Sequence, residues 1–133
     1  MTGAARLAAR AAQRAGAGMV SIACAAAERG IFAVDRPSLV VRPVEDAASL
    51  AALVGKHKVN AALIGPGAGA GEATRARVLA LLASAIPLVL DADALTSFAG
   101  DAKTLQAAAR GPVLLTPHDG EYARLFDIQG DRL

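Results

Sequence analysis

Ala62-Leu63-Ile64-Gly65-Pro66-Gly67-Ala68-Gly69 is a short apolar run that stops at a glycine-rich segment, and a helical pattern follows it. The same order recurs at residues 88–95 (LVLDADAL) and 113–121 (VLLTPHDGE), where carboxylates or a histidine follow the apolar run. Strands that alternate with helices of ten or more residues predict a parallel sheet with right-handed crossovers. Ligands bind beyond the carboxyl ends of such strands, so these three ends predict one wall of a binding site.

The alternation extends over the rest of the chain. The apolar pattern predicts helices over 3–16, 46–56, 72–85, 101–110 and 120–126, a short helix or a turn over 26–32, and strands over 19–25, 38–44, 59–64, 88–90 and 113–115. The runs Ala61–Ile64 and Leu88–Leu90 are continuous, which is typical of strands covered on both faces, and the apolar strand Met19–Ala25 is also expected to be buried on both faces. Pro43 predicts an edge position or a strand end, and Asp101 is well placed as a helix N-cap.

Composition narrows the class of protein. The chain has 133 residues, of which 54% are hydrophobic and only 3% aromatic, so one domain with a core of small aliphatic side chains is expected. The net charge of +2 and the absence of a Lys/Arg-rich run give no indication of nucleic-acid binding. The sequence contains no apolar stretch of about 18 residues or more, so no membrane span is expected. The single cysteine, Cys24, is expected to be buried and matches a reducing, cytoplasmic location.

Two of the three strand ends offer small or acidic groups. Small residues in the segment Gly65–Gly69 let the backbone approach a ligand closely, and a phosphate or pyrophosphate is the expected ligand. The alternative is a tight turn that binds no ligand, which would have the same composition. Asp91 and Asp93 are two residues apart, a spacing that allows both to project to one side. Mg²⁺ coordination through water, ribose binding or helix capping are the roles open to them.

The third strand end carries the imidazole. His118 can donate a hydrogen bond to a substrate hydroxyl or carbonyl, or titrate near neutral pH; a polar loop residue is the alternative. Glu121 follows three residues later, in the first turn of a helix, where the helix dipole favours an acid. His57 lies in a helix-to-strand loop and is expected at the opposite end of the sheet.

Five segments, in this order, resemble one protein family. They are residues 2–9 (TGAARLAA) with 14–20 (RAGAGMV), then 64–69 (IGPGAG), 89–95 (VLDADAL) and 115–122 (LTPHDGEY). Together they resemble the ADP- or ATP-dependent NAD(P)H-hydrate dehydratases. The resemblance implies a three-layer, ribokinase-like (Rossmann-like) α/β fold, in which helices flank a mostly parallel sheet in a single domain over 1–133.

The resemblance also implies a function. Members of the family repair hydrated nicotinamide cofactors: they are hydro-lyases that remove water from the S epimer of NADHX or NADPHX and consume a nucleotide. ADP or ATP with Mg²⁺ is therefore expected as co-substrate, and a homo-oligomer, a tetramer, as the assembly. The residues implied to line the hydrate pocket, shape it or orient its histidine loop are Ala4, Gly67, Gly69, His118, Asp93 and Glu121.

The chain departs from the family pattern in two respects. The family's proline after the histidine is Asp119 here, which adds a negative charge beside the ligand. The family's lysine-glycine segment and its glycine-glycine-x-glycine-aspartate motif, with the catalytic aspartate, find no match. A truncated domain is therefore expected, with no catalytic residue, little activity alone and mainly the substrate side of the site. A ribokinase-like kinase for a vitamin precursor or sugar, and a non-catalytic nucleotide-binding or assembly module, remain as alternatives.

Overall fold

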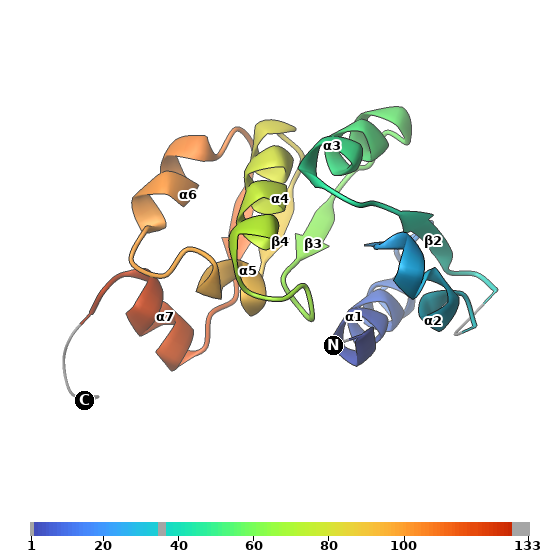
Figure 1. Ribbon diagram of the computed structural model, residues 1–133, viewed down its shortest axis with the longest axis horizontal. Coiled ribbons are helices and arrows are strands. Elements are labelled where there is room, and N and C mark those ends of the chain that lie inside the picture. Colours follow the sequence, from blue (N-terminus) through green and yellow to red (C-terminus); the bar gives the residue numbers. More distant parts are fainter. Residues whose placement is uncertain (1, 35–36, 129–133) are drawn as a thin grey trace.

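The computed structural model describes residues 2–34 and 37–128 (Figure 1) and confirms an α/β fold in which helices flank parallel strands. In chain order the elements are α1 (Thr2–Arg14), β1 (Ser21–Cys24), the 3-10 helix η1 (Ala26–Glu28), α2 (Arg29–Ala33), β2 (Val40–Pro43), α3 (Ala47–Lys56), β3 (Ala62–Ile64), α4 (Glu72–Ala83), β4 (Leu88–Leu90), α5 (Asp93–Thr96), α6 (Ala102–Ala108), β5 (Val113–Leu115) and α7 (Asp119–Leu125).

The strands form two parallel sheets. One pairs β1 with β2, and the other has the order β3-β4-β5. In the three-stranded sheet Ile64, Leu90 and Leu115 are in register, so all three strands stop at the same edge. Pro43 is the last residue of β2 in the two-stranded sheet, which confirms the strand end expected for a residue without an N–H donor.

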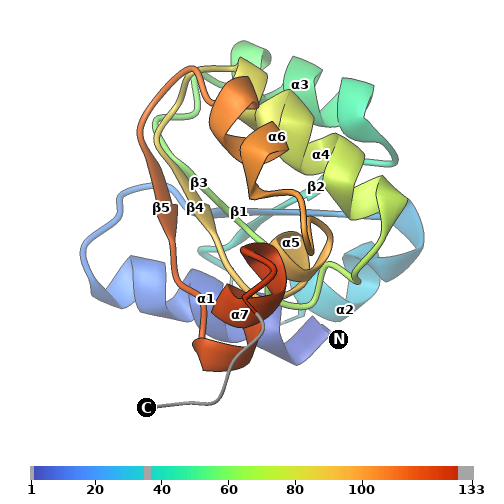
Figure 2. The same ribbon diagram turned by 90° about the vertical axis from the view of Figure 1, so that its left-hand side faces the viewer.

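The larger core lies between the three-stranded sheet and the helices on one of its sides. Figure 2 shows α3, α4 and α6 grouped on that side of β3, β4 and β5. The buried members are Val44, Leu50, Val54, Val78, Leu81, Leu82, Leu88, Leu90, Ala94, Leu95, Phe98, Leu105 and Leu125. Every helix from α3 to α7 contributes to this set, so the larger core fixes the elements around the sheet edge.

The smaller core belongs to the N-terminal elements α1, β1 and α2 and the residues that lead into β2. Its buried members are Ala9, Ile22, Cys24, Phe32 and Leu39. Cys24 is buried as predicted, and this burial raises the pKa of its thiol above the usual value. The two cores therefore divide the described chain into a small N-terminal part and a larger part that carries the three strand ends.

The expected burial of strands on both faces is wrong for two of the three apolar runs. In β1 exposed and buried residues alternate, because only Ile22 and Cys24 face the smaller core. In β3 the side chain of Leu63 is 47% exposed. Leu63 is in register with Val89 of β4 and Leu114 of β5, and Leu114 is 59% exposed. A continuous apolar run does not reveal what covers each face of a strand.

Two helix starts follow from their capping residues. The Asp46 carboxylate accepts a hydrogen bond from the Ser49 N–H (2.8 Å), and the Ser49 hydroxyl accepts one from the Asp46 N–H. The two bonds form a capping box for α3. Asp101 caps α6 through the Thr104 N–H (3.3 Å), which confirms the predicted N-cap. In the described part of the chain, no helix combines the length and the apolar character needed to cross a bilayer.

Candidate functional site

Three loops start side by side at the carboxyl edge of the three-stranded sheet. The Asp91 N–H donates to the Ile64 carbonyl (3.2 Å), and the Thr116 N–H donates to the Leu90 carbonyl (3.1 Å), so the ladder continues past each strand end. Neighbouring strands are about 4.8 Å apart, which puts the loops after β3 and β5 about 10 Å from each other. The expected convergence of the three motifs at one edge is therefore present.

The glycine loop, residues Gly65–Gly71, connects β3 to α4. Gly65 is buried at φ 133° against the carbonyl oxygen of Asp91, and an added Cβ would overlap that oxygen. Gly67, Gly69 and Gly71 also have positive φ, at 76°, 79° and 138°. Only glycine adopts such backbone without strain, so the composition of this loop follows from its path.

Internal hydrogen bonds already use several amides of the glycine loop. The Gly69 N–H donates to Asp93 Oδ2 (2.8 Å), and the Gly71 N–H donates to the Ser97 hydroxyl (3.0 Å). The Ala68 N–H donates to the Gly65 carbonyl (2.9 Å). A phosphate site needs amides that point at the anion. This arrangement therefore favours the tight-turn alternative over the phosphate cradle for these three groups.

The two aspartates have different surroundings from those that their spacing suggested. β4 ends at Leu90, and Ala92 adopts φ 46° before α5 starts at Asp93. Asp93 does not cap α5, because the N-cap position is Ala92 and the Asp93 carboxylate binds the glycine loop. Within 2–34 and 37–128, no three His, Cys, Asp or Glu side chains gather closely enough to hold a metal ion.

His118 and Glu121 interlock at the start of α7. His118 is the N-cap: its Nδ1 accepts from the Gly120 N–H (3.0 Å), while Glu121 Oε2 accepts from the His118 N–H (3.1 Å). Because Nδ1 acts as the acceptor, the hydrogen-bond pattern assigns the proton of the neutral imidazole to Nε2. Nε2 lies 3.4 Å from Glu121 Oε1. The His118 side chain is 67% exposed and that of Glu121 only 9%, so Glu121 fixes a histidine that remains accessible.

The other candidates lie on different elements. Ala4 is in the first turn of α1, and Figures 1 and 2 both show that turn near the loop between β3 and α4. His57 precedes β3 and is thus at the amino end of the strands, as expected. Its Nε2 lies 3.0 Å from Arg42 Nη1, and desolvation, Arg42 and Lys56 together lower the pKa of His57.

Sequence reasoning missed two hydroxyls that hold the glycine loop. Ser97 accepts from Gly71 and donates to the Asp93 carbonyl (2.6 Å). Thr74, which is 2% exposed, donates to the Gly69 carbonyl (2.5 Å). A hydroxyl four residues after Asp93 is the usual spacing for a bond to a carbonyl one helical turn back, and that spacing is the signal that could have identified Ser97.

The chemistry of this edge suits a ligand that donates hydrogen bonds. Asp91, Asp93 and Glu121 place carboxylates around the three loops, and the exposed imidazole of His118 adds one group that donates or accepts. Hydroxyl and amide groups match such acceptors better than an anion does. The fold places the chain in the class of parallel α/β proteins, in which ligands bind beyond the carboxyl ends of the strands.

Comparison with known proteins specifies the family. The sequence matches the NAD(P)H-hydrate dehydratase family over residues 1–132, and the chain belongs to that family. A bifunctional NAD(P)H-hydrate repair enzyme of Moorella thermoacetica is 39% identical over 147 residues, which cover 100% of this chain and 28% of the relative. The corresponding enzyme of Coxiella burnetii is 37% identical over 128 residues, covering 96% and 25%. The resemblance of the five segments is thereby confirmed.

A relative with a single stated activity also matches. The ATP-dependent (S)-NAD(P)H-hydrate dehydratase of Pediculus humanus subsp. corporis is 31% identical over 128 residues, which cover 93% of this chain and 42% of the relative. The chain thus spans 28%, 25% and 42% of the lengths of these three relatives.

Proposed function

We propose that this chain supplies the substrate side of a site that dehydrates (S)-NADHX or (S)-NADPHX, with ADP or ATP and Mg²⁺ as co-substrate. The observation that carries the proposal is the pairing of Gly69 with Asp93, and of His118 with Glu121, at one edge of a parallel sheet in a member of this family. In the proposed reaction a phosphoryl group passes to the ring hydroxyl, and loss of phosphate and a ring proton restores NADH or NADPH.

The polarity of the strand edge favours binding of the nicotinamide-ring end of the substrate there. The hydrated ring carries a hydroxyl and a carboxamide, both hydrogen-bond donors, and Asp91 and Asp93 are acceptors that attract donors. The amides of Gly69 and Gly71 are engaged within the protein, so they are not offered to a pyrophosphate. In this proposal the ring end of the hydrate occupies the edge, and its phosphates lie away from the glycine loop.

His118 is the residue proposed to recognise the ring hydroxyl. The His118 side chain is 67% exposed although its Nε2 lies 3.4 Å from Glu121 Oε1, and its Nδ1 holds the start of α7. The Glu121 carboxylate, which is buried, restrains the His118 backbone through a charge-assisted hydrogen bond. A ligand hydroxyl would therefore meet an imidazole whose position is fixed before binding, which lowers the entropy lost on binding.

The first test is calorimetric titration of (S)-NADPHX into the chain and into its His118→Asn variant. Asparagine is a good N-cap and keeps an acceptor for the Gly120 N–H, so α7 is preserved while the imidazole is lost. The expected result is a dissociation constant raised about tenfold, as for the loss of one hydrogen bond. His57→Asn, at the opposite end of the strands, is the matched control and should bind as the unaltered chain does. Equal affinity for both variants would contradict the role of His118.

The second test is turnover. NADPH formation is followed by absorbance with (S)-NADPHX, Mg²⁺ and either ADP or ATP. Nucleotide-dependent NADPH formation supports the dehydratase proposal. Binding of the hydrate without turnover is the result expected if the chain supplies only the substrate side. Binding of the nucleotide without the hydrate points to the non-catalytic alternative, and phosphorylation of hydroxymethylpyrimidine points to a kinase. Light scattering on the same sample checks the homotetramer that we include in the proposal.

A further inference from the structure

Ser97 connects two parts of the site through one hydroxyl. It donates to the Asp93 carbonyl (2.6 Å) and accepts from the Gly71 N–H (3.0 Å). The Asp93 carboxylate, one turn earlier in the same segment, accepts from the Gly69 N–H (2.8 Å). The short helix α5 with its C-cap Ser97 therefore grips the glycine loop at two amides, two residues apart.

This grip needs support, because α5 is intrinsically weak. It has four residues, and a single helical turn gains too little from its own hydrogen bonds to be stable alone. It also begins after Ala92, whose φ of 46° is a backbone conformation that alanine rarely adopts. The placement of Asp93 and Ser97 must therefore come from contacts with other elements.

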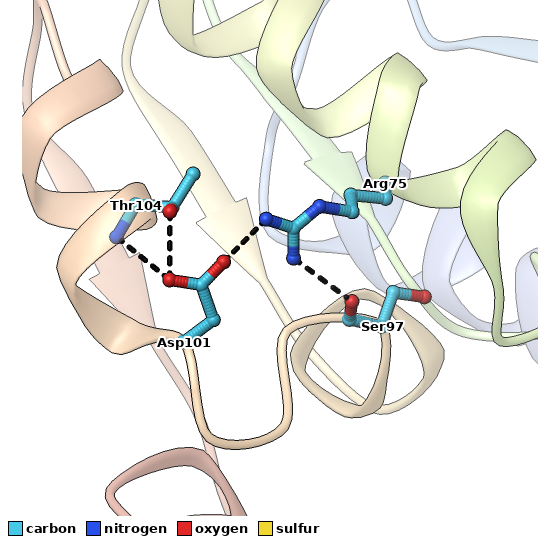
Figure 3. Close-up of polar contacts among 4 residues, drawn as sticks. All are labelled: Arg75, Ser97, Asp101 and Thr104. Atoms are coloured by element: carbon cyan, nitrogen blue, oxygen red, sulfur yellow. Dashed lines mark hydrogen bonds and ion pairs between the residues drawn. The ribbon is translucent and has the colours of Figure 1, made fainter.

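Arg75 of α4 supplies that support (Figure 3). Its guanidinium donates to the Ser97 carbonyl (3.4 Å) and to the Asp101 carboxylate, and it lies 4.3 Å from the centre of the Phe98 ring. Asp101 is held in turn by the Thr104 hydroxyl (2.7 Å) and by the Thr104 N–H. Arg75 thus joins the C-cap of α5 to the N-cap of α6, with the buried Phe98 below it.

We propose that Ser97 is a positioning residue for the glycine loop, and that Arg75 and Asp101 hold Ser97 in place. Ser97 fixes the loop through Gly71 and, by holding the Asp93 carbonyl, fixes the carboxylate that binds Gly69. The consequence for ligand affinity rests on the proposed function, because it takes the hydrated nicotinamide cofactor to be what the loop and Asp93 contact. The positioning itself is a property of the chain without ligand.

Hydrogen exchange at single amides tests the positioning directly. Ser97→Ala removes the acceptor of the Gly71 N–H, and exchange at Gly71 and Gly69 should accelerate about tenfold by NMR. Ser84→Ala is the matched control, because Ser84 is also a helix C-cap whose hydroxyl donates to a carbonyl, that of Leu81 (2.6 Å). Ser97→Thr keeps the hydroxyl and should restore slow exchange. Equal exchange at Gly69 and Gly71 in Ser97→Ala and Ser84→Ala would overturn the proposal.

The support from Arg75 has its own variant. Asp101→Asn keeps a side-chain acceptor for the Thr104 N–H, since asparagine also caps helices, but removes the carboxylate charge that pairs with Arg75. It should accelerate exchange at Gly71 by less than Ser97→Ala does. Unchanged exchange at Gly71 would remove Arg75 and Asp101 from the proposal.

Ligand binding separates this inference from the proposed function. With (S)-NADPHX, Ser97→Ala should raise the dissociation constant severalfold, while Ser97→Thr and Ser84→Ala leave it unchanged. If the unaltered chain binds no hydrate, the proposed function fails while the exchange experiment still decides whether Ser97 positions the loop. Faster exchange together with an unchanged dissociation constant would overturn the link from Ser97 to affinity.

Discussion

The two parts of the molecule differ in what holds them together. The N-terminal part, α1 to β2, surrounds the smaller core and has one two-stranded sheet. The part from α3 to α7 surrounds the larger core and carries the three strand ends of the candidate site. Of the site residues proposed from the sequence, only Ala4 belongs to the N-terminal part.

This difference shows why the polar groups of the site can be held in fixed positions. Asp93 and Glu121 each hold a backbone amide of a neighbouring residue or loop, which requires strands and helices that do not shift. Burial on the scale of the larger core supplies that rigidity. The N-terminal part buries less and is expected to open more readily, as regions with few buried apolar contacts do.

The largest effect on stability is expected from Gly65→Ala, which would disrupt the close contact between the ends of β3 and β4. The new methyl group would overlap the Asp91 carbonyl at a positive φ, so the free energy of unfolding should fall by at least about 3 kcal/mol. Urea titration measures the loss. Two glycines serve as controls. Gly69→Ala has open space but a φ of 79° and should cost about 1 kcal/mol; Gly55→Ala, within α3, should stabilise by about 0.5 kcal/mol. Equal effects of all three would contradict the close approach.

Core truncations test whether the two parts open separately. Leu90→Ala, at a fully buried position of β4, should lower the free energy of unfolding by about 2–5 kcal/mol. Phe32→Ala should instead act mainly on the smaller core, and the buried thiol of Cys24 reports that opening. The expected outcome is fast labelling of Cys24 by a thiol reagent in Phe32→Ala, with a small shift of the urea midpoint. Parallel changes of both readouts in both variants would mean that the molecule opens as one unit.

Acid is expected to act on the part around the larger core, with the smallest effect of the three. Hydrogen bonds from Thr104 and then Arg75 lower the pKa of Asp101 from 3.8, and the Ser49 amide and hydroxyl lower that of Asp46. A lowered pKa in the folded state stabilises the fold above 3.8, and this contribution is lost as the pH falls through the lowered value. Urea midpoints measured down to acid pH should therefore decline, and less steeply in Asp101→Asn. An identical decline in that variant would show that Asp101 does not contribute to the loss of stability in acid.

Much of the architecture could be predicted from the sequence, because long helices and strand ends leave local signals. Asp46 and Asp101 mark helix starts by their capping chemistry, and glycine, acid and histidine mark where β3, β4 and β5 stop. The burial of the strands could not be predicted in this way. The exposure of Leu63 and Leu114 depends on which helices cover a face, and that is a property of the tertiary fold.

The internal bonding of the candidate site was also beyond the sequence. Glycines leave φ free, so nothing in residues 65–71 says whether their amides turn outward to a phosphate or inward to Asp93 and Ser97. The helix α5 has four residues, too few to show a periodicity. The pairing of His118 with Glu121 is local, at a spacing of three residues, but its form as a capping box became apparent only in the structure, because histidine is not a usual N-cap residue.

The apolar row on the sheet, in which Leu63 and Leu114 are exposed and Val89 between them is half-buried, also affects how these molecules interact with one another in solution. Such a patch adds a short-range attraction between molecules, which a net charge of +2 opposes only weakly. Sulfate strengthens apolar association, so the second virial coefficient should fall as sulfate is added. Because one face of this small sheet is uncovered, the solubility of the chain should depend on which salt is present as much as on its concentration.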